Sequence, residues 1–165
     1  MPARRVGNLS EFSASVRLFL RAYPWRRIDP VPWTQPTKPL ARSRVALVSS
    51  AALVLRGQQP FDPRVRGGDV SFREIPADVD VRSLVDTHRS ETFDHSGIAD
   101  DPNLAFPLDR LRELASEGVI GSVAPRHFSL MGSILAPGRL IRDTAPVIAK
   151  SLASDEVDVA LLVPV

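Results

Sequence analysis

Two aliphatic runs constrain the fold of this chain more than any other feature of its sequence. Residues 44–50 (RVALVSS) and 157–163 (VDVALLV) are rich in β-branched and aliphatic side chains, with little polar alternation. Such runs are typical of strands that are buried on both faces of a parallel sheet. Parallel strands need crossover connections that are long enough to contain a helix. The two runs therefore predict an α/β fold.

Helical patterns lie between the two runs. In residues 107–118, leucines recur on one face at helical spacing, and a glycine ends the segment. Residues 137–154 carry a longer apolar stripe, interrupted by Pro146, whose members are Leu140, Ile141, Ala145, Ile148 and Leu152. Short strands are predicted at residues 71–75 and 119–123. We expect a doubly wound α/β domain that has a mainly parallel sheet with flanking helices and is incomplete at its C-terminus.

The first 43 residues differ from the rest and are interpreted as a separate lead segment, followed by the α/β domain at 44–165. An amphipathic helix is predicted over residues 10–23, with Ser10 as its N-cap. Five prolines and two tryptophans follow before residue 40, so an extended segment is expected. Residues 1–44 carry a net charge of +7 and the remainder −5. This basic lead is a solvated arm or docks on an acidic partner; without an interleaved aromatic platform, nucleic-acid binding is not expected.

Composition excludes several classes of site. The chain has no cysteine, so the 165 residues contain no disulfide, no thiolate metal site and no thiol nucleophile. The longest apolar stretch, residues 45–55, is too short to cross a bilayer. No apolar run of the signal-peptide type follows the N-terminal arginines, and we therefore expect a cytoplasmic location with no membrane partner.

Two polar segments, residues 86–96 and 121–129, hold all three histidines and are predicted as loops. The candidate site residues are His88, Asp94, His95, Arg126 and His127. Imidazole transfers protons near neutral pH, and an arginine can bind a carboxylate through two hydrogen bonds. Each also has a structural alternative, as a hydrogen-bonding strut or, for Arg126, an ordinary salt bridge. The spacing of the histidines does not match a metal site, and no phosphate-loop motif exists, so neither a metal nor a nucleotide is predicted.

One block of sequence resembles a known family. Residues 106–132 (FPLDRLRELASEGVIGSVAPRHFSLMG) resemble the selenoprotein B family of the glycine, sarcosine, betaine and D-proline reductases. The supporting segments are VALVSSAA at 45–52, PFD at 60–62, FREIP at 72–76, Thr87-His88 and Asp94-His95. The similarity covers residues 32–165, and the compact size and the lead segment are closer to the proline-reductase subunit.

The resemblance implies an oxidoreductase that cleaves a C–N bond α to the carboxylate of a small amino-acid-type substrate. In this family a selenolate attacks the α-carbon after a pyruvoyl group on a partner subunit has activated the amine as a Schiff base. A thiol then resolves the product, with a thiol or selenol electron donor. No cofactor is implied within this chain. Arg126 and His127 are expected to face the substrate anion and the selenolate, with His88 and His95 in proton transfer or in support.

The resemblance also bears on the C-terminus. In the family, the strand that matches residues 158–165 (DVALLVPV) runs directly into a selenocysteine-x-x-cysteine motif. We therefore expect selenocysteine directly after Val165, encoded by a UGA codon that has been interpreted as a stop. The chain as given would then be truncated and inactive, with an exposed apolar sheet edge or face. The alternative is a redox-inactive α/β binding module that docks on a partner subunit and has a complete fold at Val165.

Overall fold

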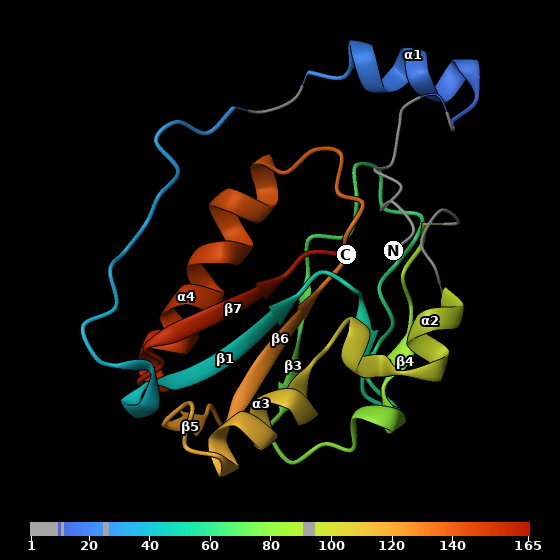
Figure 1. The fold of residues 1–165 in the computed structure, drawn as a ribbon. Coiled ribbons are helices and arrows are strands. Elements are labelled where there is room, and N and C mark those ends of the chain that lie inside the picture. The colour runs from blue at the N-terminus through green and yellow to red at the C-terminus, as the bar shows by residue number, and fades with distance from the viewer. Residues whose placement is uncertain (1–9, 11, 25–26, 91–94) are drawn as a thin grey trace, which may run out of the picture. The chain divides into compact units, whose positions relative to one another are not determined.

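The structure is a computed structural model that describes residues 10, 12–24, 27–90 and 95–165 (Figure 1). Contacts divide the chain into two units, Met1–Gln35 and Pro36–Val165, and each is described by itself. Among the described residues, no helix has the length and apolar character needed to cross a membrane.

The first unit contains one helix, α1 (Ala14–Ala22). The Ser13 side chain caps it by accepting a hydrogen bond from the Val16 N–H, so the prediction of Ser10 as the N-cap is wrong. Pro24 follows the C-cap residue Tyr23, as predicted. The helix has no buried residue, which leaves its apolar face exposed within the described part of the unit.

The second unit is built on one sheet. Its strands are β1 (Arg44–Ser49), β3 (Phe72–Pro76), β5 (Ser122–Val123), β6 (Arg126–Leu130) and β7 (Val159–Val163). β1 is central and pairs in parallel with β7 on one side and with β5 and then β6 on the other. β3 pairs antiparallel with β6. The predicted mainly parallel sheet is confirmed.

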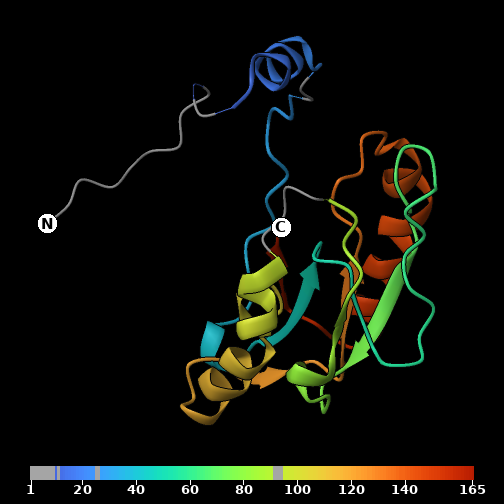
Figure 2. The same ribbon diagram turned by 90° about the vertical axis from the view of Figure 1, so that its right-hand side faces the viewer.

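Helices cover both faces of this sheet, as Figure 2 shows, with α2 and α3 on one side and α4 on the other. The α-helices are α2 (His95–Asp100), α3 (Leu108–Ser116) and α4 (Ala145–Ser154). The short 3₁₀ turns are η2 (Leu40–Arg42), η3 (Val81–Ser83) and η4 (Pro102–Leu104), and β2 (Leu53–Val54) pairs antiparallel with β4 (Val85–Asp86). This arrangement confirms the α/β class with flanking helices.

The two faces differ in packing. The face beneath α3 is sealed by large apolar side chains with almost no exposure, among them Leu47, Ile75, Phe106 and Leu108. On the α4 face, only Ile148 of the predicted five-residue stripe is buried, and Ile141 is 45% exposed. The prediction of a fully buried stripe is therefore wrong. An apolar groove of about 280 Å³ remains open between α4 and the sheet.

Three local predictions need correction. Residues 126–130 were predicted as loop but form β6, because polar His127 and Ser129 point into the interior and hide the strand pattern. The predicted helix at 137–154 begins as a π-helical turn, η5 (Leu140–Thr144), before Pro146 in the first turn of α4. This fits the ring of a proline crowding the preceding turn. The predicted strand at 119–123 shortens to β5.

Candidate functional site at the carboxyl edge of the sheet

The carboxyl ends of β1, β6 and β7 meet at one edge of the sheet because the three strands are parallel (Figure 1). In α/β folds, this edge is where ligands bind. Ser50 joins the ends of β1 and β7: its Oγ accepts a hydrogen bond from the Val165 N–H at 2.9 Å, and its own N–H donates to the Val163 carbonyl at 3.1 Å. The last residues of β7 are thereby fixed at this edge.

Gly132, just beyond β6, allows a histidine to approach the same point. A Cβ at Gly132 would lie 2.7 Å from His88 Nε2, 2.9 Å from the Ser50 carbonyl oxygen and 3.0 Å from the Val165 carbonyl oxygen. Two of these three neighbours are backbone atoms that cannot move aside. Only glycine therefore fits here without a shift of the surrounding chain. His88, Ser50 and Val165 converge on one glycine.

The His88 ring is held by its own segment. The His88 N–H donates to Asp86 Oδ1 at 2.8 Å, and Nδ1 accepts the Ser90 N–H at 3.2 Å. Burial lowers the pKa of His88; the Asp86 charge opposes this effect, and His95 and Arg89 add to it. The ring is therefore neutral at pH 7, and because Nδ1 is an acceptor, the proton is on Nε2, the atom that faces Gly132.

His95 and Asp86 form an acid–histidine pair beside His88. His95 Nδ1 lies 2.5 Å from Asp86 Oδ2, and its Nε2 lies 3.1 Å from the Ser90 carbonyl oxygen. Because both ring nitrogens face acceptors, the protonated imidazolium satisfies both contacts at once. The His88 and His95 ring centroids lie 6.4 Å apart. The structure thus places two histidines side by side, with Asp86 bound to both residues.

Arg126 and His127 lie elsewhere in the fold. Arg126 begins β6, and its guanidinium binds Asp155 through two hydrogen bonds of 2.6 and 3.1 Å and also contacts Glu74. His127 is fully buried in the same strand. Its Nδ1 accepts the Leu47 N–H at 3.0 Å, and burial lowers its pKa to about 4. Of the five predicted site residues, the structure brings together His88 and His95 only, and Asp94 lies outside the described residues.

Sequence reasoning did not single out Ser50, Asp86, Gly132 or Arg89. The Asp-x-His spacing of Asp86 and His88 was a usable signal, because an Asp side chain commonly accepts the N–H two residues ahead. Arg89 donates to the Ser133 carbonyl at 2.9 Å and to the Val65 carbonyl at 3.4 Å. It thereby supports the turn that contains Gly132. That long-range contact left no local pattern in the sequence.

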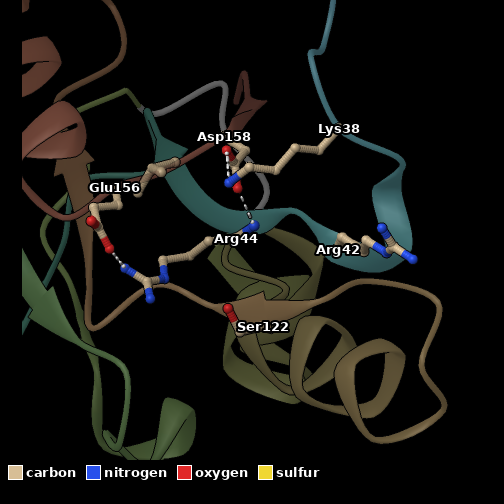
Figure 3. Close-up of a pocket in the computed structure, with 7 residues that line it drawn as sticks. Lys38, Arg42, Arg44, Ser122, Glu156 and Asp158 are labelled. Carbon is tan, nitrogen blue, oxygen red and sulfur yellow. Dashed lines mark hydrogen bonds and ion pairs between the residues drawn. The ribbon is translucent and has the colours of Figure 1, made fainter.

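Two further cavities contain charged side chains. One, of about 410 Å³, lies beside the Asp86–His95 pair. The other, of about 320 Å³, lies at the opposite edge, where β1 begins (Figure 3). Its carboxylates are already paired: Asp158 with Lys38 at 2.8 Å, and Glu156 with Arg44 at 3.4 Å. This second site joins the chain around Lys38 to the start of β7. Within the described ranges, no cluster of three or more ligating side chains could hold a metal ion.

Comparison with known proteins identifies relatives of the chain. Residues 15–164 match the family described as glycine/sarcosine/betaine reductase selenoprotein B. The D-proline reductase subunit gamma of Acetoanaerobium sticklandii is 36% identical over 136 residues, covering 82% of this chain and 54% of that protein. The glycine reductase complex component B subunit gamma of Symbiobacterium thermophilum is 29% identical over 142 residues (85% and 32%). The sarcosine reductase complex component B subunit beta of Peptoclostridium acidaminophilum is 30% identical over 149 residues (87% and 33%).

The chain spans about half the length of the first of these relatives and about a third of the other two. No solved structure matches the chain with significance.

Proposed function

Because the chain belongs to the glycine/sarcosine/betaine reductase selenoprotein B family, we propose that it is the histidine-bearing part of a selenol- or thiol-dependent reductase subunit. The reaction is the reductive cleavage of a C–N bond in an amino-acid-type substrate. Its partners are a subunit that carries a pyruvoyl group and a dithiol or selenol electron donor. The pyruvoyl group, when present, supplies the carbonyl that activates the amine. The relatives named above are reductase subunits, which supports a role within a complex.

The observation that carries this proposal is the convergence of His88 and Val165 on Gly132. His88 Nε2 and the Val165 carbonyl oxygen both lie close to the same point beside Gly132. We propose that the nucleophile is supplied there, by polypeptide beyond residue 165, because the 165 residues contain no cysteine. A selenol with a low pKa is ionised at neutral pH, and the Nε2–H of a neutral His88 can donate a hydrogen bond to it.

The histidine pair supplies the proton that the leaving amine needs. Selenolate attack on the α-carbon forms a C–Se bond and breaks the C–N bond, and the departing amine takes a proton, which His95 supplies. The thiolate of the selenocysteine-x-x-cysteine motif then attacks selenium. A selenium–sulfur bond forms, the C–Se bond breaks, and the α-carbon takes a proton from water. The dithiol donor reduces that bond and restores the nucleophile. Asp86 holds His95 in its protonated form between these steps.

The edge strand β7 gives further support. Within the described chain it pairs only with β1, and Leu161 and Leu162 are 42% and 68% exposed. An open edge of this apolar character is normally covered in a native protein. Further polypeptide or a partner subunit at this edge is consistent with the proposed complex. The alternative, a redox-inactive binding module, requires that a partner alone covers it.

The test begins with the genomic codon that follows Val165. We expect UGA and then an open frame that encodes a cysteine three positions on. The longer polypeptide, with cysteine at the UGA position, should be alkylated by iodoacetamide at neutral pH. The change His88→Phe, which removes the donor and keeps a ring, should raise the apparent pKa of that thiol by about one unit.

The matched control is Arg142→Gln, because Arg142 is an exposed arginine that pairs with its neighbour Asp143. This variant should leave the apparent pKa of the thiol unchanged. A frame that closes directly after Val165 would favour the binding module. If the frame is open but His88→Phe does not change the apparent pKa of the thiol, the family's chemistry would still apply, and His88 would have no part in it.

A further inference from the structure

We propose that the cavity beside the Asp86–His95 pair binds a small carboxylate with an aliphatic body. The cavity measures about 410 Å³, a volume that suits a small ligand. It lies between the chain from η3 to β4 and the chain from α2 to η4. Most of its wall is apolar, formed by Leu84, Val85, Ile98, Ala99 and Pro102.

The polar groups of the cavity favour an anion. They are Arg82, Asp86 and His95. Asp86 already accepts one hydrogen bond on each carboxylate oxygen, from the His88 N–H and from His95. Both of its oxygens are therefore engaged by groups of this chain. With His95 protonated, the three groups carry a net positive charge.

Arg82 is the group that would bind the carboxylate. It is exposed, and its guanidinium forms no ion pair and no side-chain hydrogen bond with any residue of the described ranges. Arg82 acts on the carboxyl of Asp101, whose pKa is lowered mainly by hydrogen bonds from Asn103 and to a smaller extent by the charges of Arg110 and Arg82. Since Asp101 is directed to Asn103, the planar guanidinium remains available for bidentate binding.

The ligand would contact the histidine cluster directly. His95 lines the cavity, and its ring lies 6.4 Å from that of His88 at the carboxyl edge. A carboxylate on Arg82 with its aliphatic part against Ile98 and Ala99 would therefore lie beside the acid–histidine pair. Binding at this cavity does not depend on the reductase chemistry, so the two proposals can fail separately.

The test is an NMR titration of the 165-residue protein with 3-methylbutanoate, followed through the backbone amides. We expect saturable shifts confined to residues 82–86 and 95–102. Arg82→Gln should weaken binding about tenfold or more, as expected for loss of a charge-assisted bidentate contact. Arg110→Gln is the matched control, because Arg110 is an exposed arginine paired with Glu113 on α3. It should bind as the parent does.

Two further measurements separate charge from shape. The neutral amide 3-methylbutanamide should bind at least about tenfold more weakly, since it lacks the charge that Arg82 recognises. Ala99→Leu, which fills the cavity and leaves every charge in place, should also abolish the shifts. Equal binding by the acid and the amide, unchanged binding by Arg82→Gln, or shifts that map to another surface would each overturn the proposal.

Discussion

His127 and His88 accept a backbone N–H in the same way, through Nδ1, and burial lowers the pKa of both. Their surroundings differ. His127 is fully buried in β6, with the Phe106 ring edge-on at 6.1 Å, and its Nε2 has no hydrogen-bond partner among the described residues. His88 lies at the carboxyl edge, close to Asp86 and His95.

The difference shows how one residue type serves two purposes in the same fold. No acid is hydrogen-bonded to His127 in the described chain, so its protonation is opposed by burial and, to a smaller extent, by the charge of Arg112, and the ring stays neutral at pH 7. Burial lowers the pKa of His88, and the Asp86 charge raises it. Its Nε2 faces the point where three chain segments meet. A histidine in such surroundings can respond to a ligand or a nucleophile at the carboxyl edge, whereas His127 is enclosed in the core.

The largest expected effect concerns His127. Its pKa is about 4 in the folded chain and about 6.5 when unfolded, so the unfolded state takes up the proton first as the pH falls. The contribution to stability is complete above pH 6.5 and is lost between pH 6.5 and pH 4. It amounts to about 3 kcal/mol.

His127→Gln, which keeps an acceptor for the Leu47 N–H, should remove this part of the pH dependence. Urea unfolding of both proteins at several pH values measures it. Parallel stability curves for parent and variant through this window would show that His127 is not buried as a neutral ring.

The next effect concerns Gly132, which brings His88 to the edge. Gly132→Ala introduces a Cβ within 3.0 Å of two carbonyl oxygens and His88 Nε2. We expect a loss of about 2 kcal/mol in the free energy of unfolding and a pKa of His88 closer to its ordinary value, because the ring is displaced toward solvent. Gly138→Ala is the control, since a Cβ at Gly138 meets no atom within 4 Å. Equal free energies of unfolding for Gly132→Ala and Gly138→Ala would contradict the close approach of these atoms to Gly132.

The sequence predicted those strands and helices whose apolar residues form a continuous run or recur at helical spacing. The aliphatic runs became β1 and β7, and the leucine face at 107–118 became α3. β6 was missed because its inward-facing positions hold His127 and Ser129, whose polarity resembles a loop. In this strand, tertiary packing overrides the local pattern.

The candidate site was only partly predictable, for a related reason. His88 and His95 were found because histidines are rare in this chain and lie close in sequence. The sequence could not show that Arg126 lies at the opposite end of β6 from Gly132, since that depends on the length of a strand that was predicted as loop. Nor could it show that Gly132, Ser50 and Val165 meet, because their contacts join segments far apart in the chain.

The smallest expected effect comes from Asp86, the group that most distinguishes the surroundings of His88 from those of His127. The Asp86 charge raises the pKa of His88 against the effect of burial. Asp86→Asn keeps an acceptor for the His88 N–H but removes that charge, so the pKa of His88 should fall further and the residue should come to resemble His127. The pKa of His127 should not change, because its shift arises from burial and then from Arg112, with no contribution from Asp86. NMR titration of the histidine Cε1 protons follows the rings in one experiment. A rise in the pKa of His88, or an equal change in both, would mean that Asp86 acts through the fold as a whole and not through its charge at the carboxyl edge.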